Sequence, residues 1–237
     1  MALATASTPE PMDVVAAAGL APVSAPGLSP GPVSPPVPRA LLEELLAERG
    51  DLWRGKGETA CAEPGLASGF AALDRALVGG GWPNAGLCEI LTDSPGPGLA
   101  LILPALARLG RQRPWILMAA PPLLPYAPAL AARGLEPGRL LVVTCQPVLW
   151  VMEQALQAGS CAAVIGWIER GTMADLRRLQ LASVQTRTPA FVFRPPAVAT
   201  QPSPAGLRLQ LGAMTPNQLE LRLLKQRGRS ATVKLRF

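Results

Sequence analysis

The sequence predicts an α/β fold in which a mostly parallel sheet is flanked by helices and continued by a C-terminal antiparallel β extension. Two patterns carry this prediction. Between residues 86 and 193, short and continuously apolar strands alternate with helical segments, which is typical of a parallel sheet covered on both faces. From residue 207 onward, apolar residues alternate strictly with polar ones, which is typical of antiparallel strands with one buried face.

The elements follow one another in a regular order. A helical turn near Ser68 and a flexible glycine-rich turn at 79–83 come first. The expected parallel strands lie at 86–91, 114–119, 140–144, 161–166 and 190–193. The expected helices lie at 98–110, 148–158 and 173–186, the second of them ending at Gly159. The alternating strands lie at 207–211, 219–223 and 233–237.

Four segments are expected along the chain. Residues 1–38 hold nine prolines and no aromatic side chain, which predicts a disordered Pro/Ala-rich arm. Residues 39–60 contain an amphipathic helix and a linker, residues 61–205 form the core, and residues 206–237 form a basic extension of that core. The amphipathic helix either packs on the core or docks a partner, and docking would use Leu42, Leu45, Leu46 and Trp53.

Composition excludes several kinds of site. The chain has no histidine, so it has no His-based catalysis and no His metal ligand. Its four cysteines are widely spaced and form no C-x-x-C pair, which favours reduced thiols over a zinc site or a disulfide framework. No positive charge precedes Arg39, which argues against a signal peptide, and no apolar run is long enough for a membrane span. We therefore expect a cytoplasmic protein without metal or cofactor.

Residues 89–100 have the order of a strand, a glycine-rich turn and a helix, as in a phosphate-binding loop. Such a loop needs a lysine on the β- and γ-phosphates and a hydroxyl on magnesium. Here Leu99 and Ala100 follow the last glycine, and no lysine lies between residues 57 and 224. The vestigial loop consists of Thr92, Asp93, Ser94, Gly96 and Gly98. Asp93 would repel phosphate, so we expect it and Ser94 to cap the following helix.

The net charge of +6 lies in the last segment. Residues 206–237 hold seven basic side chains and one acidic side chain, Glu220, whereas the other 205 residues sum to zero. The basic residues are Arg208, Arg222, Lys225, Arg227, Arg229, Lys234 and Arg236. They form either an ordinary solvated sheet face or a surface that binds phosphates or an acidic partner, and the one-sided charge favours binding.

Three tryptophans are assigned from their surroundings. Trp150 and Trp167 lie in or beside apolar segments and are expected in the core. Trp82 lies beside glycines and Pro83 and is expected to be exposed.

Several motifs in this order resemble the core of RecA/RadA recombinases. They are Gly69-Phe-Ala-Ala-Leu-Asp74, Gly79-Gly-Gly-Trp-Pro83, the run at 103–109 and Val164-Ile-Gly-Trp167. Within that superfamily the chain resembles most the ImuA family, whose members are SulA-related, RecA-like accessory proteins of bacterial mutagenic repair. The resemblance covers residues 65–237 and implies a RecA-like core.

The resemblance also implies a function. The chain would be a non-catalytic adaptor in SOS-induced mutagenic translesion DNA synthesis. Its partners would be an inactive, ImuB-like homologue of Y-family polymerases and, through it, an error-prone replicative-type polymerase, with possible contacts to RecA and DNA.

The chain departs from the recombinase pattern where chemistry would occur. Residues 119–122 are Ala-Ala-Pro-Pro at the place of a catalytic glutamate, and Gly166 stands at the place of a magnesium-orienting aspartate. We therefore expect no enzyme activity. Two alternatives remain open: a SulA-like cell-division inhibitor that binds a tubulin-like polymer, and an active RecA-type ATPase, against which the missing lysine argues.

Overall fold

The computed structural model describes residues 63–236, apart from 112–114, 145–146 and 227–230. Several predictions lie outside these residues. They concern the arm at 1–38, the amphipathic helix with Leu42, Leu45, Leu46 and Trp53, and the basic residues Arg227 and Arg229.

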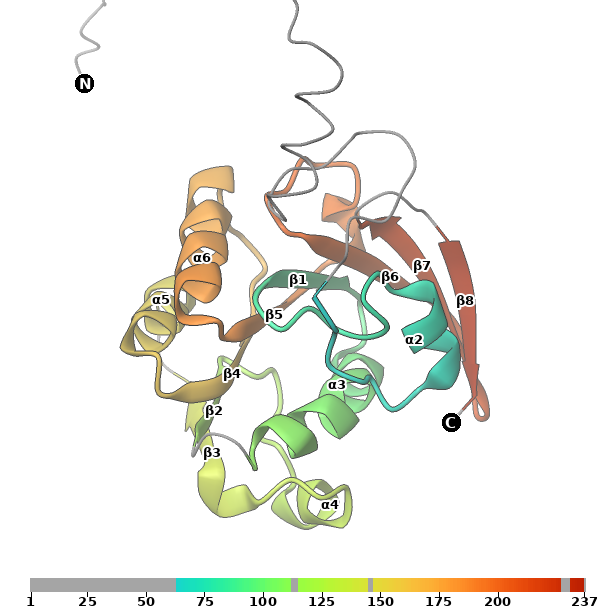
Figure 1. The fold of residues 1–237 in the computed structure, drawn as a ribbon, viewed down its shortest axis with the longest axis horizontal. Helices are drawn as coiled ribbons and strands as arrows, with labels where there is room; N and C mark the ends of the chain where they lie inside the picture. Colours follow the sequence, from blue (N-terminus) through green and yellow to red (C-terminus); the bar gives the residue numbers. More distant parts are fainter. Residues whose placement is uncertain (1–62, 112–114, 145–146, 227–230, 237) are drawn as a thin grey trace, which may run out of the picture. The chain divides into compact units, whose positions relative to one another are not determined.

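One eight-stranded sheet forms the centre of the described chain (Figure 1). Its strand order is β3-β2-β4-β5-β1-β6-β7-β8. The first six of these strands run parallel to one another, β7 is antiparallel to β6, and β8 is antiparallel to β7, which confirms the mixed sheet expected from the sequence. The strands are β1 (Gly86–Leu91), β2 (Trp115–Ala119), β3 (Leu140–Val143), β4 (Cys161–Trp167), β5 (Pro189–Arg194), β6 (Leu207–Thr215), β7 (Gln218–Lys225) and β8 (Ala231–Arg236).

Helices cover both faces of the sheet and produce two apolar cores. The helices are α2 (Ala71–Ala76), α3 (Pro95–Leu109), α4 (Ala127–Ala132), α5 (Val148–Ala158) and α6 (Met173–Thr186). Side chains of α2, α3 and α4 share one core with β6, β7 and β8, and side chains of α5 and α6 form the other core. The face of β7 and β8 that points away from the first core therefore remains polar.

Helix boundaries followed the sequence where the end signals were strong. α5 stops at Gly159, which is left-handed with φ of 64°, and α6 starts at a capping box between Thr172 and Asp175. α3 begins at Pro95, three residues earlier than expected, because proline is well accommodated in a first helical turn. Ser94 is its N-cap residue, but no side-chain hydrogen bond caps the helix, so the capping expected of Asp93 and Ser94 is wrong.

Two tryptophan assignments from the sequence are wrong. Trp82 is fully buried and packs edge-to-face against Phe191, with ring centroids 5.5 Å apart. Gly81 makes this possible, because a Cβ there would collide with the carbonyl oxygen of Leu66, the strand-like partner of Trp82. The glycine run thus combines the expected turn, in which Gly79 and Gly80 have positive φ, with a close backbone contact at Gly81. Trp150, expected in the core, is 58% exposed on α5.

No helix in the described part of the chain is both long enough and apolar enough to cross a membrane.

Candidate functional site

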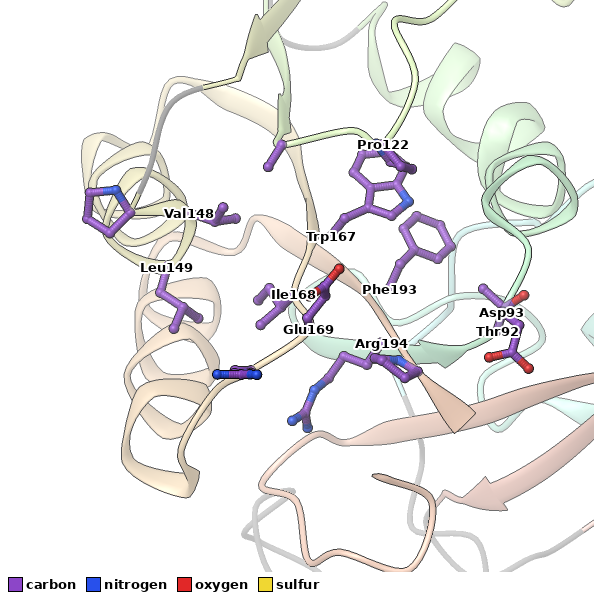
Figure 2. A pocket seen from close by; sticks show the side chains of 14 residues that line it. Thr92, Asp93, Pro122, Val148, Leu149, Trp167, Ile168, Glu169, Phe193 and Arg194 are labelled. Carbon is purple, nitrogen blue, oxygen red and sulfur yellow. The ribbon is translucent and has the colours of Figure 1, made fainter. Parts of the chain in front are cut away.

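A cleft of about 640 Å³ opens at the carboxyl ends of β1, β2, β4 and β5 (Figure 2). We call it the carboxyl-edge cleft. Open α/β sheets bind ligands at this edge, because the loops that leave the strands diverge there. Its lining includes Thr92, Asp93, Pro122, Trp167, Phe193 and Arg194. Trp167 is half-buried and stacks on Phe193, with ring centroids 4.9 Å apart and the planes at 24°.

The vestigial phosphate loop lies beside this cleft, and the hydroxyl of its Thr92 is engaged within the loop. The Thr92 hydroxyl donates to the Ser94 carbonyl oxygen at 2.9 Å and accepts from the Ser94 amide at 3.0 Å. Gly98 has a packing role, because a Cβ there would lie 2.6 Å from the Phe193 ring. The glycine expected to serve a phosphate thus lets α3 approach β5.

The end of β4 has no room for an acidic side chain. A Cβ at Gly166 would collide with the sulfur of Met152 on α5. A magnesium-orienting carboxylate could be placed here only if the Met152 side chain moved out of the core. In the described residues, no group of three or more His, Cys, Asp or Glu side chains could hold a metal ion.

Glu89 forms a buried charge cluster with two arginines next to the cleft. Arg194 Nη1 lies 3.0 Å from Glu89 Oε1, and Arg208 Nε lies 2.5 Å from Oε2. Glu89 is fully buried, and the two arginines are 4% and 6% exposed. The three residues come from the adjacent strands β1, β5 and β6, so the cluster joins the centre of the sheet. We call it the Glu89 triad, and its formal charge is +1.

The arginines of the Glu89 triad also hold the neighbouring loops. Arg208 donates to the carbonyl oxygens of Val198, Ala199 and Gln201 at 3.0, 3.3 and 2.9 Å. Arg194 reaches the carbonyl oxygen of Gly171 in the loop after β4 at 3.5 Å, while its Nε has no hydrogen-bond partner. The triad therefore holds the segment between β5 and β6, and its Arg194 lines the cleft.

Sequence reasoning missed two members of this cluster and misplaced the third. Glu89 and Arg194 are charged residues in otherwise apolar strands. Because a buried charge needs a partner of opposite charge, their positions could have predicted a buried ion pair. Arg208 was expected on the exposed basic face. That is wrong, because β6 runs beside β1 with Arg208 opposite Glu89, and the segment at 198–201 covers its guanidinium.

Three of the remaining basic residues that are described lie on one exposed face, whereas Lys225 follows the alternation of Leu221 and Leu223 on the other side of β7. Arg222 pairs across the strands with Thr232, and Glu220 pairs with Lys234, so these side chains share the polar side of β7 and β8 with Arg236. Lys225 is exposed and donates to the Ser203 carbonyl oxygen at 2.7 Å. We call Arg222, Lys234 and Arg236 the basic face.

The cysteine on β1 offers no reactive thiol. Burial raises the pKa of Cys88 to about 12, so this thiol stays protonated at neutral pH. Cys161 is buried as well, and Cys61 and Cys145 lie outside the described residues.

Comparison with known proteins gives a consistent set of relatives. No family model matches the chain. The cell division inhibitor SulA of Serratia marcescens is 31% identical over 119 residues, covering 48% of this chain and 71% of the relative. SulA of Edwardsiella piscicida is 31% identical over 118 residues, covering 48% of this chain and 70% of the relative. The crystal structure of SulA from Pseudomonas aeruginosa is 25% identical and covers 46% of this chain and 96% of its own, with a TM-score of 0.39.

The Glu89 triad predicts a large stability loss on Glu89→Gln. The change leaves two buried guanidinium groups without a counter-charge, and breaking a buried pair in this way costs about 3–5 kcal/mol. Denaturant unfolding of the two proteins measures the difference.

A matched control is Glu136→Gln, which breaks the exposed pair with Arg139. Surface pairs contribute about 0–1 kcal/mol, so the control should unfold close to the native chain. Equal effects of the two substitutions would contradict the structural role of the triad.

Proposed function

The chain belongs to the family of SulA cell division inhibitors, and on this premise we propose that it blocks division by binding the tubulin-like division protein. The observation that carries the proposal is the match to relatives of one printed name, each covered over at least two thirds of its length. The proposed target is a cytoplasmic protein, which agrees with the localisation expected from the sequence.

This family corrects the function expected from the sequence. An adaptor role in translesion DNA synthesis is wrong, because the relatives are named cell division inhibitors, and the alternative stated beside it takes its place. The partners that depended on that role fall with it: the ImuB-like polymerase homologue, the error-prone polymerase, RecA and DNA. The SulA-related part of the resemblance stands, but these relatives give no support to the ImuA family in particular.

The proposal includes an inactive core. We regard the sheet as a degenerate RecA-like core, supported by the glycine-rich loop that follows its central strand β1. No lysine lies between residues 57 and 224, and Gly166 leaves no space for a carboxylate. The chain then acts by binding alone and turns over no ATP.

Purified division protein provides the test of this function. Stoichiometric amounts of the chain should lower the mass of polymer that sediments after GTP addition, because an inhibitor that binds subunits removes them from assembly. A heat-unfolded sample of the same chain is the control. Undiminished polymer in the presence of excess folded chain would overturn the proposed function.

We further propose that the basic face steers this encounter by meeting an acidic surface of the division protein. Its three side chains are exposed and lie on adjacent strands, so their fields add. Rim charges of this kind act mainly on the association rate and on its salt dependence.

The variant Arg222→Glu, Lys234→Glu, Arg236→Glu should therefore associate about ten-fold more slowly, with a weaker dependence on salt. A variant of three other exposed arginines, Arg111→Glu, Arg133→Glu, Arg177→Glu, carries the same change in net charge and is the control. Stopped-flow association rates compare the two. Equal slowing of both would reduce the effect to overall charge and contradict a local role for the basic face.

A further inference from the structure

The loop between β2 and α4 exposes three large apolar side chains. Leu123, Leu124 and Tyr126 are 75%, 76% and 71% exposed, and no other large apolar side chain in the described part of the chain is as open. Soluble proteins rarely show large apolar patches without a binding role. We call residues 121–126 the apolar loop.

The backbone of the apolar loop is held at both ends. Ala120 has φ of 49°, an unusual value for a residue with a Cβ, and its amide donates to the Val143 carbonyl oxygen at 2.7 Å. At the other end the Tyr126 carbonyl oxygen accepts from the amides of Ala129 and Leu130, and Leu130 is buried in the core. Strained backbone of this kind concentrates at functional sites, where the surrounding structure enforces it.

Prolines stiffen the loop between these two anchors. Pro121, Pro122 and Pro125 fix their own φ angles, and Pro122 and Pro125 disfavour the helical conformation of the residues before them, Pro121 and Leu124. The backbone that carries the apolar side chains therefore has little conformational entropy to lose when a partner binds. A rigid loop lowers the entropic cost of binding, because less of the loop has to be ordered in the complex.

The surroundings of the loop define the chemistry of its partner. No charged residue occurs between 114 and 132, so the loop offers neither ion pairs nor electrostatic steering. Pro122 at its start lines the carboxyl-edge cleft, which places the loop at the rim of that cleft (Figure 2). A fitting acceptor is therefore an uncharged apolar groove.

We propose that the apolar loop is the anchor by which this chain enters an apolar groove of the division protein, an inference that rests on the proposed function. Leu123, Leu124 and Tyr126 together can bury roughly 400 Å². A stable interface buries about 800 Å² on each partner, so the loop supplies about half of that area and neighbouring surface must supply the rest. It suits the centre of a contact with a different protein, in which the basic face adds attraction at a distance.

The test is the variant Leu123→Ser, Leu124→Ser, Tyr126→Ser, examined in the full chain. Surface plasmon resonance with the division protein should show an affinity at least ~100-fold weaker, because central apolar anchors carry most of the binding energy. The loss should lie in the dissociation rate and be the same between ~50 and ~200 mM salt, since no charge is removed. The melting temperature should not change, because the side chains are exposed.

The control is Leu181→Ser, Val184→Ser on α6, where the native side chains are 60% and 50% exposed. Its affinity should equal that of the native chain. Native-like affinity of the loop variant, with inhibition by the native chain intact, would overturn this inference and leave the proposed function standing. If the native chain neither binds the division protein nor inhibits its assembly, the proposed function fails and the inference falls with it.

Two other occupants of the loop are separate outcomes, and each would overturn the proposal. A lower melting temperature of the loop variant would show that the loop packs on residues of its own chain. Sedimentation of the native chain as a dimer, with the loop variant as a monomer, would show that a second copy occupies it.

Discussion

Glu89 and the two arginines on the neighbouring strands hold together the centre of the sheet. A carboxylate inside an apolar strand is costly unless its charge is balanced, and here two guanidinium groups from the neighbouring strands balance it. The same guanidinium groups reach backbone carbonyls in the loops after β4 and β5. The pairing of the central strands and the position of the loops after β4 and β5 therefore depend on one cluster of charges, of which Arg194 also lines the carboxyl-edge cleft.

At the carboxyl edge, the residues that the sequence suggested as a vestigial nucleotide site make packing contacts and local hydrogen bonds. Gly98 gives space to Phe193, the Thr92 hydroxyl bonds within its own turn, and Gly166 gives space to Met152. The residues at the positions where an ATPase would bind phosphate and magnesium therefore make structural contacts within this chain. The same edge carries the apolar loop, which supports the proposal that this part of the molecule binds a protein.

Local signals predicted much of the fold. β1, α5 and α6 have the expected boundaries, because an apolar run or helical period ended at a clear signal such as Gly159 or Thr172. α4 was missed, since its six residues are alanine, proline and leucine and show no helical period. Long-range packing decided the rest: Trp82 is buried by a backbone contact of Gly81, and Trp150 is exposed because its position on α5 faces away from the sheet.

The candidate site was harder to predict than the fold. Strict alternation placed Arg208 on the outer face, and only the pairing of β6 with β1 shows that Glu89 lies opposite it. The resemblance led to the SulA-related group but to the wrong function within it, because the missing lysine and acids exclude chemistry without naming a partner. Exposure of Leu123 and Leu124 follows from the path of the loop after Ala120, which no sequence period encodes.

The central claim is that the carboxyl edge of the sheet binds a protein and does not hydrolyse a nucleotide. Its most direct test measures how strongly the chain inhibits assembly of the division protein, with and without ATP and magnesium. Released phosphate is measured in the same samples and compared with a blank that contains the same GTP but lacks the chain. We expect equal inhibition in both conditions and no ATP turnover above the blank. Inhibition that requires ATP, or turnover that disappears in the Thr92→Ala variant, would contradict the claim.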